Sequence, residues 1–146
     1  FPEVFNFELF ELYMPGSAWN FSQGMKAATD FEDFFGRKTY ATNTSGGYYA
    51  TRLPILEYLN KVKRQASALA IRIETPGYWA GLGVWVVRES VRKSLNKKME
   101  FSSKEELLNA CKQIGMIKFN FNPENIIKRS KILNQVLKQK KLSNWF

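Results

Sequence analysis

The sequence predicts an α+β fold, with a single compact domain that holds a small sheet, several helices and a flexible C-terminal tail. Strand-like and helix-like segments follow one another unevenly, without the regular alternation of a parallel α/β protein. The 146 residues are 45% hydrophobic, which suits one domain with an ordinary core. We therefore expect one domain over residues 1–138 and a tail over residues 139–146.

In the first half of the chain, the apolar pattern predicts strands at both ends and helices between them. Residues 4–13 alternate apolar and polar residues, which predicts a half-buried strand. We expect a loop over residues 17–28, with Trp19 and Phe21 covering the core's edge, and then a short helix over residues 29–36. The next expected element is a helix over residues 48–64, in which Pro54 predicts either a kink or a late start near Leu53. Its buried stripe would be Ile55, Leu56, Leu59 and Val62, and a strand over residues 67–74 is expected to follow.

In the second half, we expect mainly helices. Residues 82–95 have strand-forming residue types, but their apolar residues keep a helical face, so we predict a helix. Ser103 and Glu106 have the spacing of a capping box, and Gly115 is expected to follow the helix end. The other expected elements are a turn at residues 75–77, short strands at residues 99–101 and 118–121, and a helix over residues 123–138.

Composition excludes several classes of site and of protein. The chain has no histidine and one cysteine, Cys111, so an internal disulfide, a Cys-cluster metal site and His-based catalysis are excluded within this segment. No apolar run approaches the length of a membrane span, and we expect no membrane partner. We predict no cofactor and no metal within this segment, and a cytoplasmic, nucleoid-associated location.

Charge is divided unevenly along the chain. Residues 1–60 hold four Lys/Arg and seven Asp/Glu, whereas residues 61–146 hold eighteen and six, so the halves carry −3 and +12 of the +9 total. A strongly basic half predicts a polyanionic partner, and we expect DNA. A lysine-rich solvated surface is the plainer alternative.

The most site-like interior segment is residues 37–49, where hydroxyls, an amide and two glycines precede the helix expected at residues 48–64. Glycines allow close backbone approach, and free amides at a helix start can hold phosphate. The segment is no Walker A motif. A capped turn, with Asn43 or Thr44 as the cap, is the commoner explanation for such a composition.

A wider set of residues could bind nucleic acid or a small ligand. Arginines would receive phosphates, and Tyr48, Tyr49 and Trp79 would stack on a base. Each arginine could instead fasten two elements by pairing with an acid, as Arg88 could with Glu89. The candidates are Arg37, Asn43, Thr44, Gly46, Gly47, Tyr48, Tyr49, Arg52, Glu57, Arg64, Arg88 and Glu89.

The chain ends in the pattern Gln139-x-x-Leu142-x-x-Trp145-Phe146. This pattern resembles the PCNA-interacting peptide (PIP) box, the motif that binds the sliding clamp. The resemblance implies that Gln139 enters a small polar pocket of PCNA and that the three apolar side chains fill a hydrophobic one. The alternative is an ordinary helix end whose aromatics fold back on their own domain.

Five interior segments resemble the C-terminal part of the archaeal Nre DNA-repair family. They are Phe35-Gly36-Arg37, Asn43-Thr44-Ser45-Gly46-Gly47-Tyr48-Tyr49, Leu56-Glu57-Tyr58-Leu59, Arg64-Gln65-Ala66-Ser67 and Leu82-Gly83-Val84-Trp85-Val86-Val87-Arg88-Glu89. The resemblance implies a role in DNA-damage repair with recruitment through the clamp, and an N-terminal portion that is absent here and carries a Cys-rich element in some members. It implies no reaction, and the catalytic residues stay unknown.

Two further hypotheses stay open beside DNA repair. The first is a nuclease-like enzyme acting on nucleic acid or a nucleotide, for which a divalent metal would have to be held by acids such as Glu57, Glu74 and Glu89. The second is a non-catalytic module whose basic half contacts protein.

Overall fold

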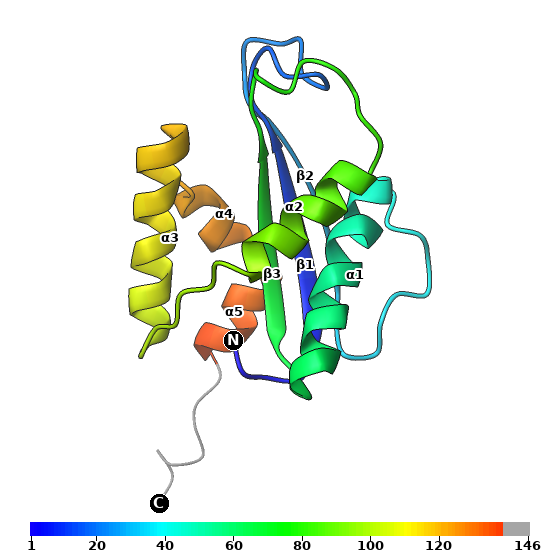
Figure 1. Ribbon diagram of the computed structural model, residues 1–146. Coiled ribbons are helices and arrows are strands. Elements are labelled where there is room, and N and C mark those ends of the chain that lie inside the picture. Colours follow the sequence, from blue (N-terminus) through cyan, green and yellow to red (C-terminus); the bar gives the residue numbers. More distant parts are fainter. Residues whose placement is uncertain (139–146) are drawn as a thin grey trace, which may run out of the picture. The chain divides into compact units, whose positions relative to one another are not determined.

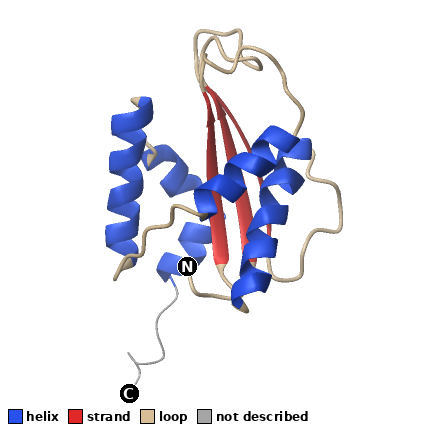
Figure 2. Ribbon diagram, in the orientation of Figure 1, coloured by secondary structure: helices blue, strands red, loops and turns tan. Residues whose placement is uncertain are grey.

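The computed structural model describes residues 1–138 and confirms the α+β class (Figures 1 and 2). The predicted tail, residues 139–146, lies outside the described residues. The described residues divide into two compact units, a sheet unit (Pro2–Met99) and a helical unit (residues 100–138 with Phe1). The elements are β1 (Asn6–Tyr13), β2 (Lys26–Glu32), α1 (Ser45–Val62), β3 (Ser67–Glu74), α2 (Trp85–Leu95), α3 (Lys104–Phe119), α4 (Glu124–Arg129) and α5 (Lys131–Lys138).

Strand β1 is the centre of the three-stranded sheet, whose order is β2-β1-β3. It pairs antiparallel with β2 and parallel with β3. The prediction of a half-buried strand was wrong, because both faces of β1 are buried. Phe7 and Leu9 point to one face and Phe10 and Leu12 to the other, and none of the four is more than 1% exposed.

Strand β2 replaces the short helix expected from Thr29. The prediction was wrong because seven residues pair with β1, from Lys26 opposite Tyr13 to Glu32 opposite Phe7. They comprise the last three residues of the expected loop and the first four of the expected helix, so the loop also ends earlier than predicted. Local capping signals are weaker than a full ladder of strand hydrogen bonds.

The aromatic residues around β2 do not cover the core. Trp19 and Phe21, in the β1–β2 loop, are exposed, Phe21 by 92%, and so are Phe34 and Phe35 after the strand. The prediction that Trp19 and Phe21 cover the core's edge was therefore wrong, and none of the four belongs to the buried core.

Helix α1 begins at Ser45, three residues before its predicted start, and continues through Pro54 to Val62. The late start near Leu53 was wrong. Its buried residues are Gly47, Tyr48, Ala50, Thr51 and Pro54. The predicted stripe from Ile55 to Val62 is only partly buried or exposed, because the first half of the helix is the part that covers the sheet.

Strand β3 has its predicted bounds, and the expected turn follows it, closed by the Tyr78 amide donating to the Thr75 carbonyl. Helix α2 is confirmed over the strand alternative, although it starts at Trp85. α1 and α2 lie on the same side of the sheet in Figure 1, and residues of both line one pocket with β3. The short strand expected at residues 99–101 was wrong, since these residues have no strand partner among the described residues.

In the helical unit, the capping box at the start of α3 is present. Ser103 Oγ accepts from the Glu106 amide, and the Glu106 carboxylate accepts from the Ser102 amide. Gly115 does not end this helix, which continues to Phe119 and closes at Asn120 in the left-handed region.

Gly115 has a packing role. A Cβ at Gly115 would lie 2.8 Å from the Phe121 carbonyl oxygen, so glycine allows the returning chain to approach the helix. The strand expected at residues 118–121 was wrong because α3 includes its first half.

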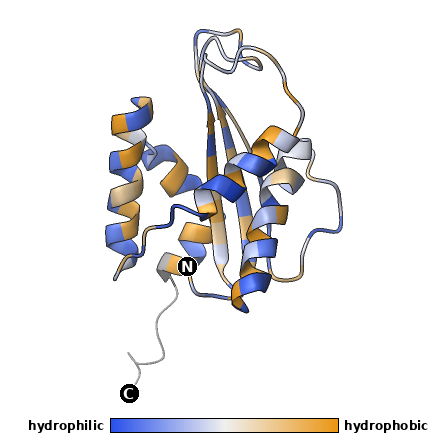
Figure 3. Ribbon diagram, viewed as in Figure 1, coloured by the Kyte–Doolittle hydropathy of each residue, from blue (hydrophilic) through white to orange (hydrophobic). Residues whose placement is uncertain are grey.

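The last predicted helix is two helices. Ser130 has an extended ψ of 125° and separates α4 from α5. Its hydroxyl accepts from the Leu133 amide, so Ser130 stops one helix and caps the next. Apolar and polar bands alternate along these helices (Figure 3), and Ile132, Leu133 and Val136 of α5 are buried. No helix within residues 1–138 is long and apolar enough to cross a bilayer.

Candidate functional site

The sheet unit carries charged side chains on the face that α1 covers. The register aligns Glu32 with Phe7, Asp30 with Leu9, and Glu11 with Arg72 across neighbouring strands, and aligned residues project to the same face. The acidic side chains there are buried: Glu11, Asp30, Glu32 and Glu74 are each at most 6% exposed. Buried carboxylates require partners, and two clusters form around them. A third cluster, of exposed side chains, joins α1 to α2.

The first cluster joins β1 and β3 and is centred on Arg72. Its guanidinium donates to Glu11 Oε1 and to Glu74 Oε2, each at 3.0 Å. The Tyr13 hydroxyl donates to Glu11 Oε2 at 2.6 Å. Burial raises the pKa of Tyr13, and the bond to Glu11 raises it further, so the phenol stays a donor. Arg72 also lies over the Tyr78 ring, 5.8 Å from its centroid.

The second cluster surrounds Asp30 at the start of α1. Its carboxylate accepts from the Thr44 amide at 2.8 Å and from the Thr44 hydroxyl at 2.9 Å, and Arg37 lies 3.3 Å away. Asn43 donates to the Thr29 carbonyl and, at 3.4 Å, to Asp30. Thr44 occupies the N-cap position without a side-chain cap bond, because its hydroxyl is bonded to Asp30.

Within this cluster, Arg37 fastens the loop between β2 and α1. It donates to the backbone carbonyls of Phe31, Thr39 and Tyr40. The structure therefore brings Arg37, Asn43 and Thr44 together, in bonds that hold the protein's own loop.

The glycines at the start of α1 allow close approach within the protein. A Cβ on Gly47 would overlap the Glu11 carboxylate, and a Cβ on Gly46 would lie 2.9 Å from Val84 Cγ1. These contacts place β1 and the start of α2 against the first turn of α1.

The two tyrosines that follow differ in their exposure. Tyr48 is completely buried against Phe7, with ring centroids 4.9 Å apart, so it cannot stack on a base in this structure. Tyr49 is partly exposed, and its hydroxyl accepts from the Ala41 amide.

The remaining candidates lie along α1 and α2. Arg52 pairs with the buried Glu32. Glu57 and Glu89 both pair with Arg92, at 2.9 Å and 2.6 Å, which ties α1 to α2 and forms the third cluster.

Two arginines lie beside or outside these clusters. Arg88 lies 3.6 Å from Glu89. Arg64 is exposed beyond the end of α1. The twelve predicted residues therefore occupy separate places, and their role toward a ligand stays a prediction.

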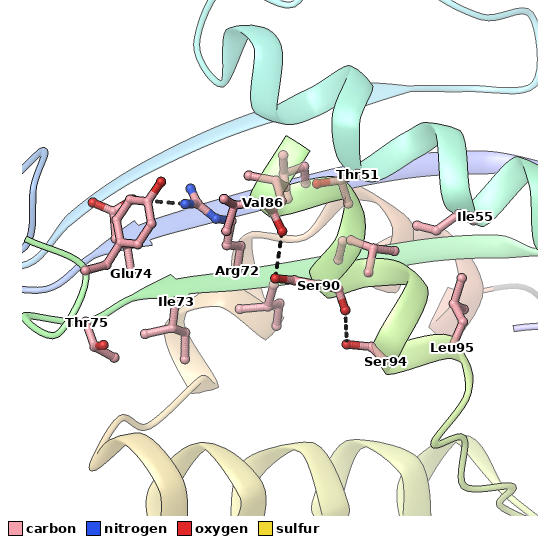
Figure 4. Close-up of a pocket in the computed structure, with 16 residues that line it drawn as sticks. Thr51, Ile55, Arg72, Ile73, Glu74, Thr75, Val86, Ser90, Ser94 and Leu95 are labelled. Carbon is pink, nitrogen blue, oxygen red and sulfur yellow. Dashed lines mark hydrogen bonds and ion pairs between the residues drawn. The ribbon is translucent and has the colours of Figure 1, made fainter. Parts of the chain in front are cut away.

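Sequence reasoning missed the pocket of the sheet unit. A cavity of about 430 Å³ lies between β3, α1 and α2. It is lined by Thr51 and Ile55 of α1, residues 70–75, and the inner face of α2, and none of the twelve predicted residues is among them. Figure 4 shows Arg72 and Glu74 toward one end and Ile55 and Leu95 toward the other. Its walls are mainly aliphatic, so it suits a ligand with an apolar body and a polar end.

A weak signal for this site was present in β3, where Arg72 and Glu74 interrupt a strand of apolar residues at the same parity. Within residues 1–138, no group of three or more His, Cys, Asp or Glu residues is placed to hold a metal ion. Burial raises the pKa of the Cys111 thiol, which favours its neutral form.

Comparison with known proteins places these features in context. The family described as "Archaeal Nre, C-terminal" matches residues 32–145. The chain is 46% identical over 111 residues to "DNA repair protein NreA" of Archaeoglobus fulgidus, covering 75% of this chain and 28% of that protein. It is 45% identical over 100 residues to "DNA repair protein NreA" of Haloferax volcanii, covering 67% of this chain and 24% of that protein.

A third relative is "DNA repair protein NreB" of Archaeoglobus fulgidus, 41% identical over 108 residues, covering 73% of this chain and 27% of that protein. The chain thus spans about a quarter of the length of the curated relatives it matches. No solved structure matches it significantly.

Proposed function

Because this chain belongs to the archaeal Nre family, matching its C-terminal part over residues 32–145, we propose that it acts in DNA repair. The observation that carries this proposal is the 46% identity to a protein named for DNA repair. The repair role would be exercised in the cytoplasm at the nucleoid, together with the N-terminal portion that longer family members have.

We further propose that residues 139–146 recruit the protein to the sliding clamp, PCNA. All four specifying positions of the PIP pattern are present: Gln139, Leu142, Trp145 and Phe146. Aromatic side chains entering an apolar pocket contribute most of the binding free energy in interfaces of this kind. Lys138, Lys140 and Lys141 add positive charge that speeds encounter with an acidic surface.

The triple substitution Leu142→Ala/Trp145→Ala/Phe146→Ala is expected to weaken clamp binding by at least about 100-fold, because it removes every apolar anchor of the motif. Calorimetric titration of the clamp with the complete chain measures this change. The matched control is Ser143→Ala/Asn144→Ala, which alters the two free positions and should bind as the wild type does. Equal affinities for the triple variant and the wild type would eliminate clamp recruitment through this motif.

We propose that the basic half of the chain binds DNA. Because Glu11, Asp30, Glu32 and Glu74 are buried, fewer acids are exposed on the sheet unit than its sequence suggests. Exposed cations remain, among them Lys61, Lys63 and Arg64 at and beyond the end of α1. Such cations contact phosphates and release counterions. Trp79, which is 81% exposed, offers a ring on which an unpaired base could stack.

We propose DNA binding without catalysis. Glu74 pairs with Arg72, whereas Glu57 and Glu89 pair with Arg92, so the acids considered for a nuclease lie in two separate clusters. Binding without catalysis requires only exposed cations and rings, which the described surface has.

A further inference from the structure

Strand β3 has one edge that no described strand covers, since the sheet order is β2-β1-β3. The Glu74 carbonyl accepts from the Met14 amide at 2.9 Å, so the backbone groups of Glu74 face the β1 side. Successive residues of a strand direct their N–H and C=O groups to opposite sides. The backbone groups of Ile71 and Ile73 therefore face the outer edge, where an added strand would find them.

The pocket described above runs along this edge. Leu9 of β1 lines it together with six consecutive residues of β3 and its turn, 70–75, so it lies over the α1 face of the sheet and continues to the edge strand. Ile71, Ile73 and Thr75, whose side chains project to the other face, are among the lining residues, so the pocket reaches the β3 backbone. Six strand residues extend roughly 17 Å. The opposite wall is α2, through Val87, Val91 and Leu95 and, at the rim, Ser90 and Ser94. The shape is a groove between an edge strand and a helix, shown along β3 and α2 in Figure 4.

One end of the groove carries unused hydrogen-bonding capacity. Glu74 Oε1 and Thr51 Oγ1 are buried and have no hydrogen-bond partner among the described residues, and both side chains line the pocket. Glu74 is 3% exposed and Thr51 2%. Glu11, Arg72 and Glu74 together carry one net negative charge, so this end suits a cation or an amide donor.

We propose that this groove binds an extended peptide segment, which adds to β3 as a fourth strand. Its backbone would pair with Ile71 and Ile73, and apolar side chains at alternate positions would fill the aliphatic wall formed by α2. A lysine or amide side chain would approach Glu74 at the polar end. About five residues are needed to follow the groove. A peptide accounts for both the length of the groove and its backbone edge, whereas a small apolar ligand would leave that edge unpaired.

The test uses the complete chain, labelled with ¹⁵N, and synthetic hexapeptides of alternating valine and threonine with a lysine at one end or the other. Binding is expected to shift the amide signals of Ile71 and Ile73 and to slow their hydrogen exchange. Ser90→Tyr places a ring at the rim of the groove and should weaken binding by about tenfold or more. Lys93→Tyr, on the same helix but outside the groove, should leave it unchanged. The backbone spectrum reports that both variants fold.

Three outcomes would overturn the proposal. The first is that neither peptide perturbs the amide signals of Ile71 and Ile73 at concentrations up to about 1 mM. The second is that the Ser90→Tyr variant binds the peptides as tightly as the Lys93→Tyr variant does. The third is that a hexapeptide interrupted by proline, which cannot pair as a strand, binds equally well, because the groove is then a site for apolar side chains alone. None of these results depends on clamp or DNA binding, so the function proposed above would be unaffected.

Discussion

Replacing Arg72 with methionine is expected to destabilise the sheet unit by about 3 kcal/mol, because it leaves Glu11 and Glu74 buried without their shared cation. Both carboxylates are at most 3% exposed and each accepts a hydrogen bond from Arg72. The value is at the low end for breaking a buried ion pair, since the Arg72 side chain is itself partly exposed. Urea denaturation, followed by tryptophan fluorescence, measures the free energy of unfolding.

Arg92→Met is the matched control for this prediction. Arg92 also contacts two glutamates, Glu57 and Glu89, but all three side chains are exposed to solvent. Solvent screens exposed ion pairs, which contribute little to stability, so this variant should change the free energy of unfolding much less than Arg72→Met does. Adding Glu11→Gln and Glu74→Gln to Arg72→Met should recover part of the loss, because neutral amides cost less to bury. Equal losses of unfolding free energy in the Arg72→Met and Arg92→Met variants would show that the buried cluster around Arg72 adds nothing to stability.

Replacing Gly47 with alanine is expected to destabilise the sheet unit by about 2–3 kcal/mol, although alanine is intrinsically better than glycine in a helix by about 1 kcal/mol. The new methyl group would overlap the Glu11 carboxylate. Glu11 cannot turn away freely, because Tyr13 and Arg72 hold both of its oxygens. Either α1 must move from the sheet or the cluster around Arg72 must open.

Gly46→Ala, one residue earlier in α1, is the control for this substitution. The atom nearest to its new methyl group is Cγ1 of Val84, whose side chain is half exposed and can rotate. In thermal unfolding, the midpoint temperature of the Gly47→Ala variant should be well below that of the Gly46→Ala variant. A Gly47→Ala protein as stable as the wild type would contradict the close approach of Glu11 to α1.

The local pattern of apolar and capping residues predicted those elements whose signals lie within a few neighbouring residues. The strand alternation of β3, the capping box at Ser103 and the helical face of α2 each lie within a few residues of sequence, and each is present. β2 was missed because its conformation depends on pairing with β1, a long-range interaction that competes with capping signals at Thr29 and Asp30.

The roles of Gly115 and Ser130 also could not be predicted from local pattern. Gly115 has the usual signature of a helix end, but its actual role depends on the Phe121 backbone that returns across α3. Ser130 interrupts an apolar pattern that is continuous in sequence. The spacing of apolar residues indicates neither the close approach at Gly115 nor the helix break at Ser130.

The candidate site was the least predictable part. Arg72 and Glu11 are separated by 61 positions, and only the parallel register of β1 with β3 places them side by side. Sequence reasoning emphasised Arg37 and Asn43 because they flank glycines, and the structure places them around Asp30, an acid that had been expected to start a helix. Arg37 and Asn43 were predicted as candidates and Arg72 and Glu11 were not, and the partners of all four follow from the long-range pairing of the strands.

The most direct test of the proposed role is the salt dependence of DNA binding by the complete chain. Fluorescence anisotropy with a labelled duplex should give a slope of log K against log[salt] of about −3 or steeper, since several phosphates are neutralised. Lys61→Glu/Arg64→Glu, in the basic half, should flatten the slope by about 2, whereas Lys26→Glu/Lys38→Glu, with the same change in charge in the first half, should flatten it little. A slope near zero, or equal effects of the two double variants, would contradict DNA binding by the basic half.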